Sequence, residues 1–530
     1  SPLQYQEWFS KIPTKNQDKI SADWGPVPGE VLVAGGDFCI PGQVNGNIFI
    51  GIQPPRGLFE KVESLIHSND MVMPHQYLAY YRWIKHVFGA HVVIHMGTHG
   101  TLEWLPGKGN ALSEECCPDV ILEDMPHIYP YIMNDPGEGI QAKRRSWSVL
   151  LDHLVPAMMR AEGYGDLLQL DTILQDYLRA KRGGEEQKAK DLITEVRSIV
   201  LARNLTYDLG LPVDAEIEVI AENAERLYDY ICEVRDVIIK DGLHIFGQPP
   251  ADERFLEMIY ALTRLENGKV PSLRESVAKT CDLSLQDLLE NPSGFNIDHQ
   301  LTNGALVDLI DSRCQQLIEK MAEVKFDRDL IIFAIQEEYG EHYKDLETCC
   351  MFICDEVVSR LNQTTDELTN MIRGLDAGYV PPGPCGDPTR GNVHLLPTGR
   401  NCYSIDPATI PTPAAWKTGK DMADQMIERY ITEKGEYPQK VGIVVWATDT
   451  MRTGGDDIAY ILWLMGLRPI WSSRGGTVTG LEVIPAKELA RPRIDVTLRI
   501  SGLFRDSYPN LVQLIDEGVE IIATLDESDE

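Results

Sequence analysis

Two histidines and a glutamate fall within nine residues of one another in a glycine-rich segment. They are His95, His99 and Glu103, and they follow a short β-branched run, residues 91–94, that predicts a buried strand. Imidazole and carboxylate groups bind divalent metals and move protons near neutral pH. Because open α/β sheets bind ligands where their strands end, this segment is a candidate catalytic and metal-binding site.

The spacing of the two histidines is similar to that of a zinc protease helix, but the similarity is incomplete. A zinc protease needs a glutamate directly after the first histidine, whereas Met96 follows His95, and Gly97 and Gly100 oppose a helix. A zinc protease is therefore disfavoured, and another metal-dependent hydrolase would require a tight zinc site with a catalytic water at these three residues. A structural alternative stays open, in which both histidines form local hydrogen bonds and Glu103 is a surface or capping group.

The stretch from His95 to Lys108 resembles the motif His-x-Gly-x-His-Gly-x-x-Glu-aromatic-x-Pro-Gly-Lys of the large subunits of cobaltochelatase and magnesium chelatase. The resemblance extends along the chain to residues 47–57, 74–75, 80–81, 142–146, 396–401 and 454–457. Residues 491–506 are closer to the cobalt branch. Cys385 departs from the family pattern, in which a small residue is expected.

The resemblance implies a protein that holds a tetrapyrrole while a divalent metal is inserted. Co²⁺ is the preferred metal substrate, with a corrinoid such as hydrogenobyrinic acid a,c-diamide as acceptor, in cobalamin biosynthesis. Two alternatives stay open: Mg²⁺ insertion into a porphyrin, and a tetrapyrrole-binding protein without catalysis. Family members are longer, so we expect a fragment or a split subunit, truncated at its C-terminus.

The resemblance also implies partners. The large subunit works with AAA+ ATPase subunits, and this chain has no Gly-x-x-x-x-Gly-Lys-Ser/Thr phosphate loop, so we expect ATP to be hydrolysed by those separate subunits.

Metal insertion requires two pyrrole protons to leave and the hydrated ion to lose water. We predict that Glu103 and His99 share the roles of base and metal-handling group, with His95 as the next candidate; the spacing does not assign the two roles. The same three residues are the predicted metal ligands. The predicted substrate-binding residues are His75, Arg400, Asp449, Arg452, Arg499 and Arg505, whose arginines suit a carboxylate-rich macrocycle. Asp387 and His394 are weaker candidates.

Composition narrows the class of protein. The chain has 530 residues, 43% of them apolar, which is enough for about two to four domains with buried cores. A net charge of −32 argues against binding to nucleic acid or to an anionic membrane surface. The clearest basic group, residues 143–145, is either a solvated helix face or a contact for an anionic substrate.

Eleven cysteines without any Cys-x-x-Cys predict reduced thiols, and Cys349, Cys350 and Cys354 are expected to pack in a helix. The sequence shows no apolar stretch of about 18 residues and no signal sequence, so we predict a cytoplasmic location without a membrane span.

The predicted fold class is α/β, with doubly wound, mostly parallel sheets at both ends of the chain and a helical middle region. We divide the chain into an α/β region at 1–145, a mainly helical domain at 146–375 and a second α/β region at 376–530. Residues 447–455 are predicted as a loop, and the two α/β regions are expected to meet around one site.

Individual elements follow from local patterns. Predicted strands are residues 31–33, 47–51, 440–446, 469–471, 494–498 and 519–523. Helices are predicted at 74–88 and 456–465. Apolar residues between Ile217 and Ile238 recur in steps of three and four, which predicts one amphipathic helix capped by Asp214 and ended by Gly242.

Overall fold

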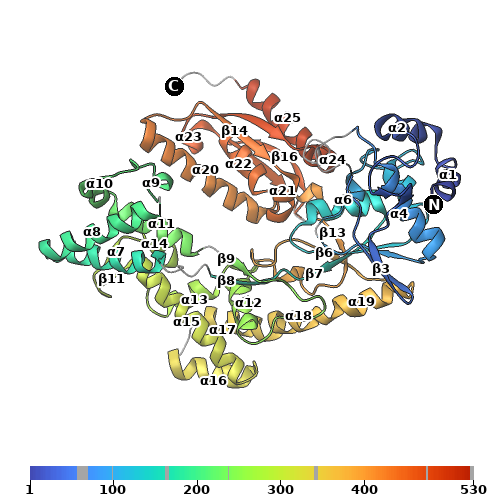
Figure 1. Ribbon diagram of the computed structural model, residues 1–530. Coiled ribbons are helices and arrows are strands. Elements are labelled where there is room, and N and C mark those ends of the chain that lie inside the picture. The colour runs from blue at the N-terminus through green and yellow to red at the C-terminus, as the bar shows by residue number, and fades with distance from the viewer. Residues whose placement is uncertain are drawn as a thin grey trace. The chain divides into compact units, whose positions relative to one another are not determined.

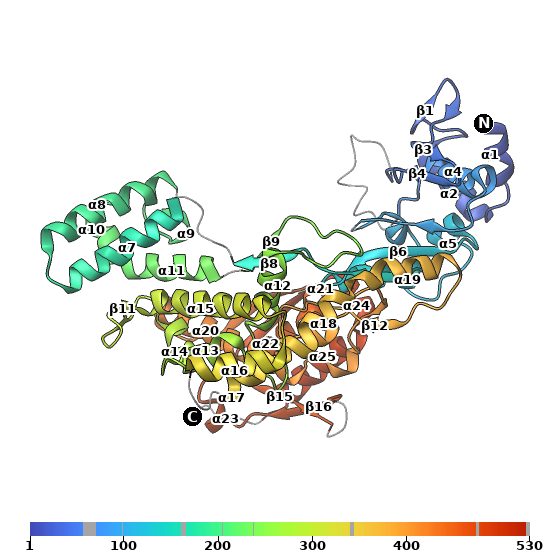
Figure 2. The same cartoon turned by 90° about the horizontal axis from the view of Figure 1, so that it is seen from below.

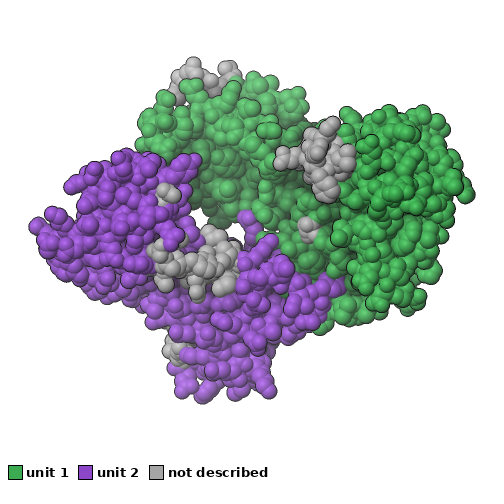
Figure 3. Space-filling view, viewed as in Figure 1, with its two compact units in different colours: residues 1–154, 365–387, 397–530 green, residues 155–364, 388–396 purple. Residues whose placement is uncertain are grey.

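The computed structural model describes residues 1–56, 70–97, 99–160, 166–203, 205–236, 238–339, 344–472 and 476–525 (Figure 1). Some residues used in the sequence analysis lie outside these described ranges: Gly57 and Thr98 of the family motifs, and residues 526–530 at the predicted truncation point. The chain forms two compact units, in different colours in Figure 3. Unit 1 comprises residues 1–154, 365–387 and 397–530, and unit 2 comprises residues 155–364 and 388–396. The two units therefore interleave along the chain.

The central sheet of unit 1 has five strands. In spatial order they are β12 (Pro382–Pro384), β13 (Asn401–Tyr403), β7 (Val149–His153), β6 (His127–Ile132) and β5 (Val93–Ile94). β5, β6 and β7 run parallel, with α5 (Cys117–Leu122) and α6 (Pro136–Ser146) as their connections, whereas β13 is antiparallel to β7. The α/β class is confirmed, in a mixed sheet that is rich in parallel pairs.

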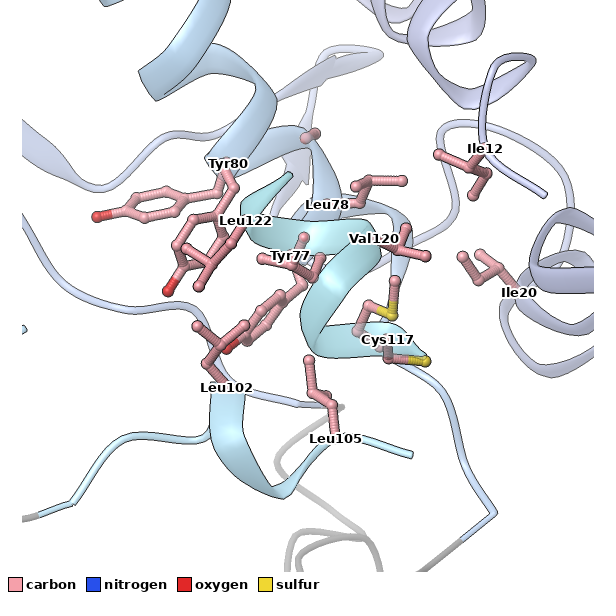
Figure 4. Packing of buried hydrophobic residues seen from close by; sticks show 14 of the residues in the cluster. Ile12, Ile20, Tyr77, Leu78, Tyr80, Leu102, Leu105, Cys117, Val120 and Leu122 are labelled. Atoms are coloured by element: carbon pink, nitrogen blue, oxygen red, sulfur yellow. The ribbon is translucent and has the colours of Figure 1, made fainter. Parts of the chain in front are cut away.

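The N-terminal part of unit 1 consists of helices and two short antiparallel strand pairs. Its elements are α1 (Pro2–Phe9), α2 (Thr14–Trp24), the pair β1 (Val33–Ala34) and β2 (Asp37–Phe38), the hairpin of β3 (Gly42–Asn45) and β4 (Ile48–Gly51), α4 (His75–Trp83) and the π-helical turn η2 (Ile84–Phe88). The predicted helix at 74–88 and strand at 47–51 are confirmed, and the strand predicted at 31–33 is shifted to β1. Figure 4 shows the shared core, in which Tyr77 and Leu78 meet Leu102 and Val120.

The C-terminal part of unit 1 is a second α/β region. It contains η7 (Pro407–Thr409), α20 (Pro413–Lys434), β14 (Lys440–Val445), α21 (Ala447–Thr453), α22 (Asp456–Met465), β15 (Leu467–Trp471), β16 (Val478–Val483), α23 (Ala486–Leu489), β17 (Asp495–Ile500), α24 (Gly502–Ser507) and α25 (Pro509–Ala523). β14 pairs parallel with β17, and β15 pairs antiparallel with β16. Gly419 permits the close packing of α20 on α22, since a Cβ there would collide with the backbone of Asp456.

Two predictions in this region are wrong. Residues 447–453 form α21 instead of a loop, because Ala447, Thr450 and Met451 are buried along one face of a helix. The strand predicted at 519–523 is the end of α25, whose buried Leu511 and Ile515 continue the same helical stripe. The helix at 456–465 and the other three strands of this region are confirmed.

Unit 2 is mainly helical. Its helices are α7 (Asp166–Arg182), α8 (Glu186–Ala202), α9 (Leu205–Asp208), α10 (Ile217–Glu222), α11 (Ala224–Asp236), α12 (Glu253–Thr263), α13 (Leu273–Lys279), α14 (Leu285–Glu290), α15 (Asn303–Glu323), α16 (Arg328–Tyr339), α17 (Lys344–Phe352), η4 (Ile353–Val357) and α18 (Val358–Asn362). Its short strands are β8 (Ala157–Arg160), β9 (Ile238–Asp241), β10 (Phe295–Asn296) and β11 (Leu301–Thr302). Figure 2 shows α7 and α8 side by side, and they share one core with α10 and α11. The turn η5 (Gln363–Thr365) and α19 (Asp366–Leu375) lead back into unit 1, and η6 (Val393–Leu395) lies in the second segment of unit 2.

The prediction of a single helix over residues 217–238 is also wrong. α10 ends at Glu222, where the Asn223 side chain donates to the Val219 carbonyl at 2.8 Å, and α11 begins at Ala224. Residues 238–241 leave the helix altogether and pair as β9 with β8. The core assignment holds nonetheless, because Leu227 and other members of the stripe are buried.

The cysteines also differ from the prediction in one place. β12 and β13 are neighbours, and Cys385, directly after β12, forms a disulfide with Cys402 in the middle of β13, with the Cα atoms 5.6 Å apart. The expectation of reduced thiols therefore fails for this pair. Cys349 and Cys350 are buried as predicted. Within the described residues, no helix combines the length and apolarity that a bilayer crossing requires.

Candidate functional site

The His/Glu motif lies where two neighbouring parallel strands end. β5 leads into residues 95–104, and β6 leads through residues 133–135 into α6. The carboxyl ends of parallel strands meet at one sheet edge, so the segments after β5 and β6 approach each other. His99 Nδ1 contacts Glu138 Oε2, and one ligand atom each of His99, Asp135 and Glu138 lies within 4.8 Å of the other two.

Asp135 and Glu138 are absent from the residues predicted by sequence. Asp135 is the N-cap residue of α6, and Pro136 occupies the first position of that helix. An aspartate followed by a proline is a sequence signal for the start of a helix. Burial raises the pKa of Asp135, against the nearby His99 charge. Burial likewise raises the pKa of Glu138, and the negative charge of Asp135 adds to this effect.

Glu103 lies on the turn η3 (Leu102–Trp104), in the same segment after β5 as His99. Its side chain is 0% exposed, and the Tyr129 hydroxyl donates to Oε1 at 3.4 Å. Oε2 makes no hydrogen bond to any residue that the structure describes. Burial raises the pKa of Glu103, although hydrogen bonds and the His99 charge oppose the rise. A buried carboxyl with a raised pKa and an open oxygen is suited to accept a proton.

The backbone around Glu103 is fixed by α6. Arg145 donates from Nη1 to the Glu103 carbonyl at 2.8 Å and from Nη2 to the Leu105 carbonyl at 2.7 Å. Lys143 donates to the Asn401 side chain at 2.7 Å. These two members of the basic group at 143–145 therefore hold the fold together, and they do not form a free cationic face.

His95 occupies a deeper position than His99. Its Nε2 lies 3.0 Å from the Tyr81 hydroxyl, and its ring centroid lies 4.3 Å from that of His127. Burial and the neighbouring His127 hold the pKa of His95 well below its usual value, so the imidazole is neutral. Nδ1 has no hydrogen-bond partner among the described residues. His95 can therefore accept a proton or a metal only from the side of Nδ1.

The second α/β region reaches the same edge through α21. Thr448 packs on Gly137 at the start of α6 so closely that a Cβ on Gly137 would collide with it. The positive charge of Arg452 opposes the rise in the pKa of Asp135, and Arg452 Nη2 is held 2.6 Å from Asp449 Oδ1. The predicted approach of the two α/β regions is confirmed within unit 1.

The remaining predicted arginines are distributed over unit 1. Arg505 pairs with its neighbour Asp506 at 2.9 Å, and Arg499 is exposed on β17. The Arg400 backbone N–H donates to Asp152 Oδ1 at 2.6 Å, which ties the start of β13 to β7.

His75 is part of the core. Its Nδ1 lies 2.9 Å from the Tyr5 hydroxyl and its Nε2 lies 2.9 Å from the Gly25 carbonyl, and the side chain is buried among aromatic rings. Because both ring nitrogens are engaged within the core, His75 has no polar side-chain atom left to contact a substrate, unlike Glu103 and His95. Asp387 and His394, the weaker candidates, fall in different compact units.

Comparison with known proteins connects this geometry to a family. The model of the family described as CobN/magnesium chelatase matches residues 1–530. The aerobic cobaltochelatase subunit CobN of Sinorhizobium sp is 37% identical over 557 residues, covering 99% of this chain and 42% of that protein. The chloroplastic magnesium-chelatase subunit ChlH of Oryza sativa subsp. japonica is 30% identical over 536 residues, covering 96% of this chain and 38% of that protein.

A solved structure agrees. The catalytic subunit of cobaltochelatase from Mycobacterium tuberculosis matches with a TM-score of 0.86 and 38% identity, covering 100% of this chain and 44% of that chain. The chain thus spans less than half the length of these relatives.

Proposed function

This chain belongs to the CobN/magnesium chelatase family, and from that premise we propose that it is the tetrapyrrole-holding part of a cobaltochelatase large subunit. The reaction places Co²⁺ in a corrinoid such as hydrogenobyrinic acid a,c-diamide, in cobalamin biosynthesis. Separate AAA+ subunits hydrolyse ATP. We assign the reaction to the cytoplasm; the nine described cysteines that are free thiols favour a reducing compartment, whereas the Cys385–Cys402 disulfide does not.

The observation that carries this proposal is the buried carboxyl of Glu103 beside His99. As the metal bonds to the ring nitrogens, two N–H protons leave; Glu103 Oε2 accepts one of them, and the other passes to water. Tyr129 orients the carboxyl through Oε1, and Arg145 fixes the backbone that bears it. A positioned proton acceptor typically contributes about 10²–10⁴-fold to a rate. His95, a neutral imidazole with an open Nδ1, is the second candidate acceptor.

The corrinoid rim carries many carboxylates, and arginine binds carboxylates through two parallel hydrogen bonds. We assign rim contacts to Arg452, Arg499, Arg505 and Arg400, with Asp449 orienting Arg452. Among these, Arg452 has the strongest support, because its charge acts directly on Asp135 at the edge where His99 lies.

Magnesium insertion into a porphyrin is the alternative, supported by the 30% identity to the ChlH subunit. The higher identity to the CobN subunit favours cobalt. Titration of the purified chain with hydrogenobyrinic acid a,c-diamide and with protoporphyrin, followed by absorbance, distinguishes them. We expect tighter binding of the corrinoid, and a clear preference for protoporphyrin would refute the cobalt assignment.

The variant Glu103→Gln tests the catalytic role. The amide keeps the size of the side chain but cannot accept the proton, so tetrapyrrole affinity should stay within a few-fold while metal insertion falls by at least ~10²-fold. Insertion is measured in the complete large subunit assembled with its ATPase partners. Glu115→Gln, which removes an exposed carboxylate of unit 1, is the matched control. Normal insertion by Glu103→Gln would reduce the motif to a structural role and leave only binding.

A further inference from the structure

The chemistry of the cluster of His99, Asp135 and Glu138 suits a divalent metal that has to be released again. One imidazole and two carboxylates can occupy one side of a first-row ion and leave its other positions to water. The side chains of His99 and Glu138 are 45% and 28% exposed, whereas the carboxylate oxygens Asp135 Oδ1 and Glu138 Oε2 are themselves buried, so the cluster is open to solvent on the side of His99. The set differs from that predicted from sequence, since Asp135 and Glu138 replace His95 and Glu103.

A second, independent observation points to a cation at this place. Glu103 is fully buried, its Oε2 has no hydrogen-bond partner among the described residues, and its charge acts on both His99 and Glu138. Glu103 Oε2 lies against Gly100, the residue that follows His99, since a Cβ on Gly100 would stand 3.2 Å from it. A third, buried carboxyl therefore lies next to the residue that carries the imidazole. A divalent ion in the cluster would add positive charge to that of Arg452, which alone does not balance these carboxylates.

Arg452 limits how tightly such an ion is held. Its guanidinium acts on Asp135 and is itself anchored by Asp449 at 2.6 Å. The cluster therefore experiences one fixed positive charge from the second α/β region. A metal bound there is repelled by that charge, which favours its transfer over its permanent retention.

We propose that His99, Asp135 and Glu138 form the loading site of the metal substrate, where the ion waits before it enters the tetrapyrrole. The identity of the ion as Co²⁺ rests on the proposed function, whereas the site itself rests on the geometry. In this arrangement Glu103 remains free of the metal and serves as proton acceptor. The loading site and the base are then adjacent but separate.

The test is Co²⁺ binding to the purified chain without tetrapyrrole, measured by isothermal titration and by the visible spectrum of the bound ion. We expect one site per chain, and at least tenfold weaker binding in Asp135→Asn and in Glu138→Gln. His86→Gln is the matched control, because His86 also faces a carboxylate, Glu123, at 3.8 Å, but in a pair neutralised by Lys85. Arg452→Met should bind Co²⁺ several-fold more tightly.

The outcomes separate this site from the proposed function. Unchanged Co²⁺ affinity in both carboxylate variants, with tryptophan fluorescence like the wild type, overturns the loading site whatever the tetrapyrrole titrations give. Weaker binding in Arg452→Met contradicts the role given to that arginine. If the wild-type chain binds Co²⁺ at this site but binds neither tetrapyrrole, the proposed chelatase function is refuted and the metal site is retained.

Discussion

Asp152→Asn should abolish a fall in stability that unit 1 undergoes as the pH rises from about 4 to 7. Asp152 lies on β7, where its side chain is buried and Oδ1 accepts the Arg400 backbone N–H at 2.6 Å. Oδ2 has no partner among the described residues. Burial raises the pKa of Asp152 from 3.8 to about 7, against the opposing hydrogen bond and charge of Arg400.

The magnitude follows from proton linkage. The unfolded chain loses this proton near pH 3.8, whereas the folded chain keeps it to about pH 7, so the contribution to stability is full below the first value and decreases up to the second. At 1.36 kcal/mol for each pH unit, the whole decrease is ~4 kcal/mol, of which ~3 kcal/mol falls between pH 4.5 and pH 8. Asparagine keeps the acceptor oxygen and cannot ionise.

Urea unfolding followed by tryptophan fluorescence measures this effect, because all nine tryptophans lie in unit 1. Relative to wild type, Asp152→Asn should gain ~3 kcal/mol of unfolding free energy between pH 4.5 and pH 8. Asp421→Asn, at an exposed position of α20, should show no such change. A difference between variant and wild type that is independent of pH would mean that the Asp152 proton leaves at an ordinary pKa, and the reasoning would fail.

Two further substitutions separate structural from functional roles. Arg145→Lys replaces the two donor nitrogens Nη1 and Nη2 by one nitrogen on a shorter side chain, which cannot stand at both positions. One of the carbonyls of Glu103 and Leu105 therefore loses its donor, and the unfolding free energy should fall by ~1–3 kcal/mol. The control is Arg429→Lys on exposed α20, and an unchanged melting temperature in Arg145→Lys would contradict the assignment. His75→Gln should likewise lower the unfolding free energy by ~1–3 kcal/mol and leave the dissociation constant for the corrinoid unchanged within about twofold. A tenfold weaker corrinoid affinity at wild-type stability would return His75 to the substrate site.

Elements with a long local pattern could be predicted from the sequence, and elements decided by distant packing could not. The helix at Asp456–Met465 has its predicted bounds because its apolar pattern and its flanking glycines agree. Residues 519–523 are rich in β-branched side chains and predict a strand, but in the fold they extend the buried stripe of α25. The three threonines of α21 disfavour a helix, and burial of Met451 against the core overrides that preference.

The residues of the candidate site also fall into two groups, those that one sequence motif places together and those that only the fold brings to them. His95, His99 and Glu103 belong to one short motif, so the sequence places them together without knowledge of the fold. Asp135 and Glu138 come from the segment after the next strand, and only the parallel pairing of β5 with β6 brings them to His99. The signal that could have found them is a carboxylate pair at the start of a helix that follows a strand, read together with the neighbouring strand exit.

The insertion of unit 2 within unit 1 sets an order for synthesis of the chain. β7 is complete at residue 153, but its neighbour β13 begins only at residue 401. At roughly 5–20 residues per second, the ribosome needs on the order of 10–50 s to make the intervening segment. During that time β7 is the open edge of a half-built sheet, which is the kind of edge that pairs with other chains. Most of unit 2 is synthesised before β13 and can fold during this interval. The risk of aggregation is therefore highest between the synthesis of β7 and that of β13. We expect the need for chaperones during translation to be greatest in the same interval.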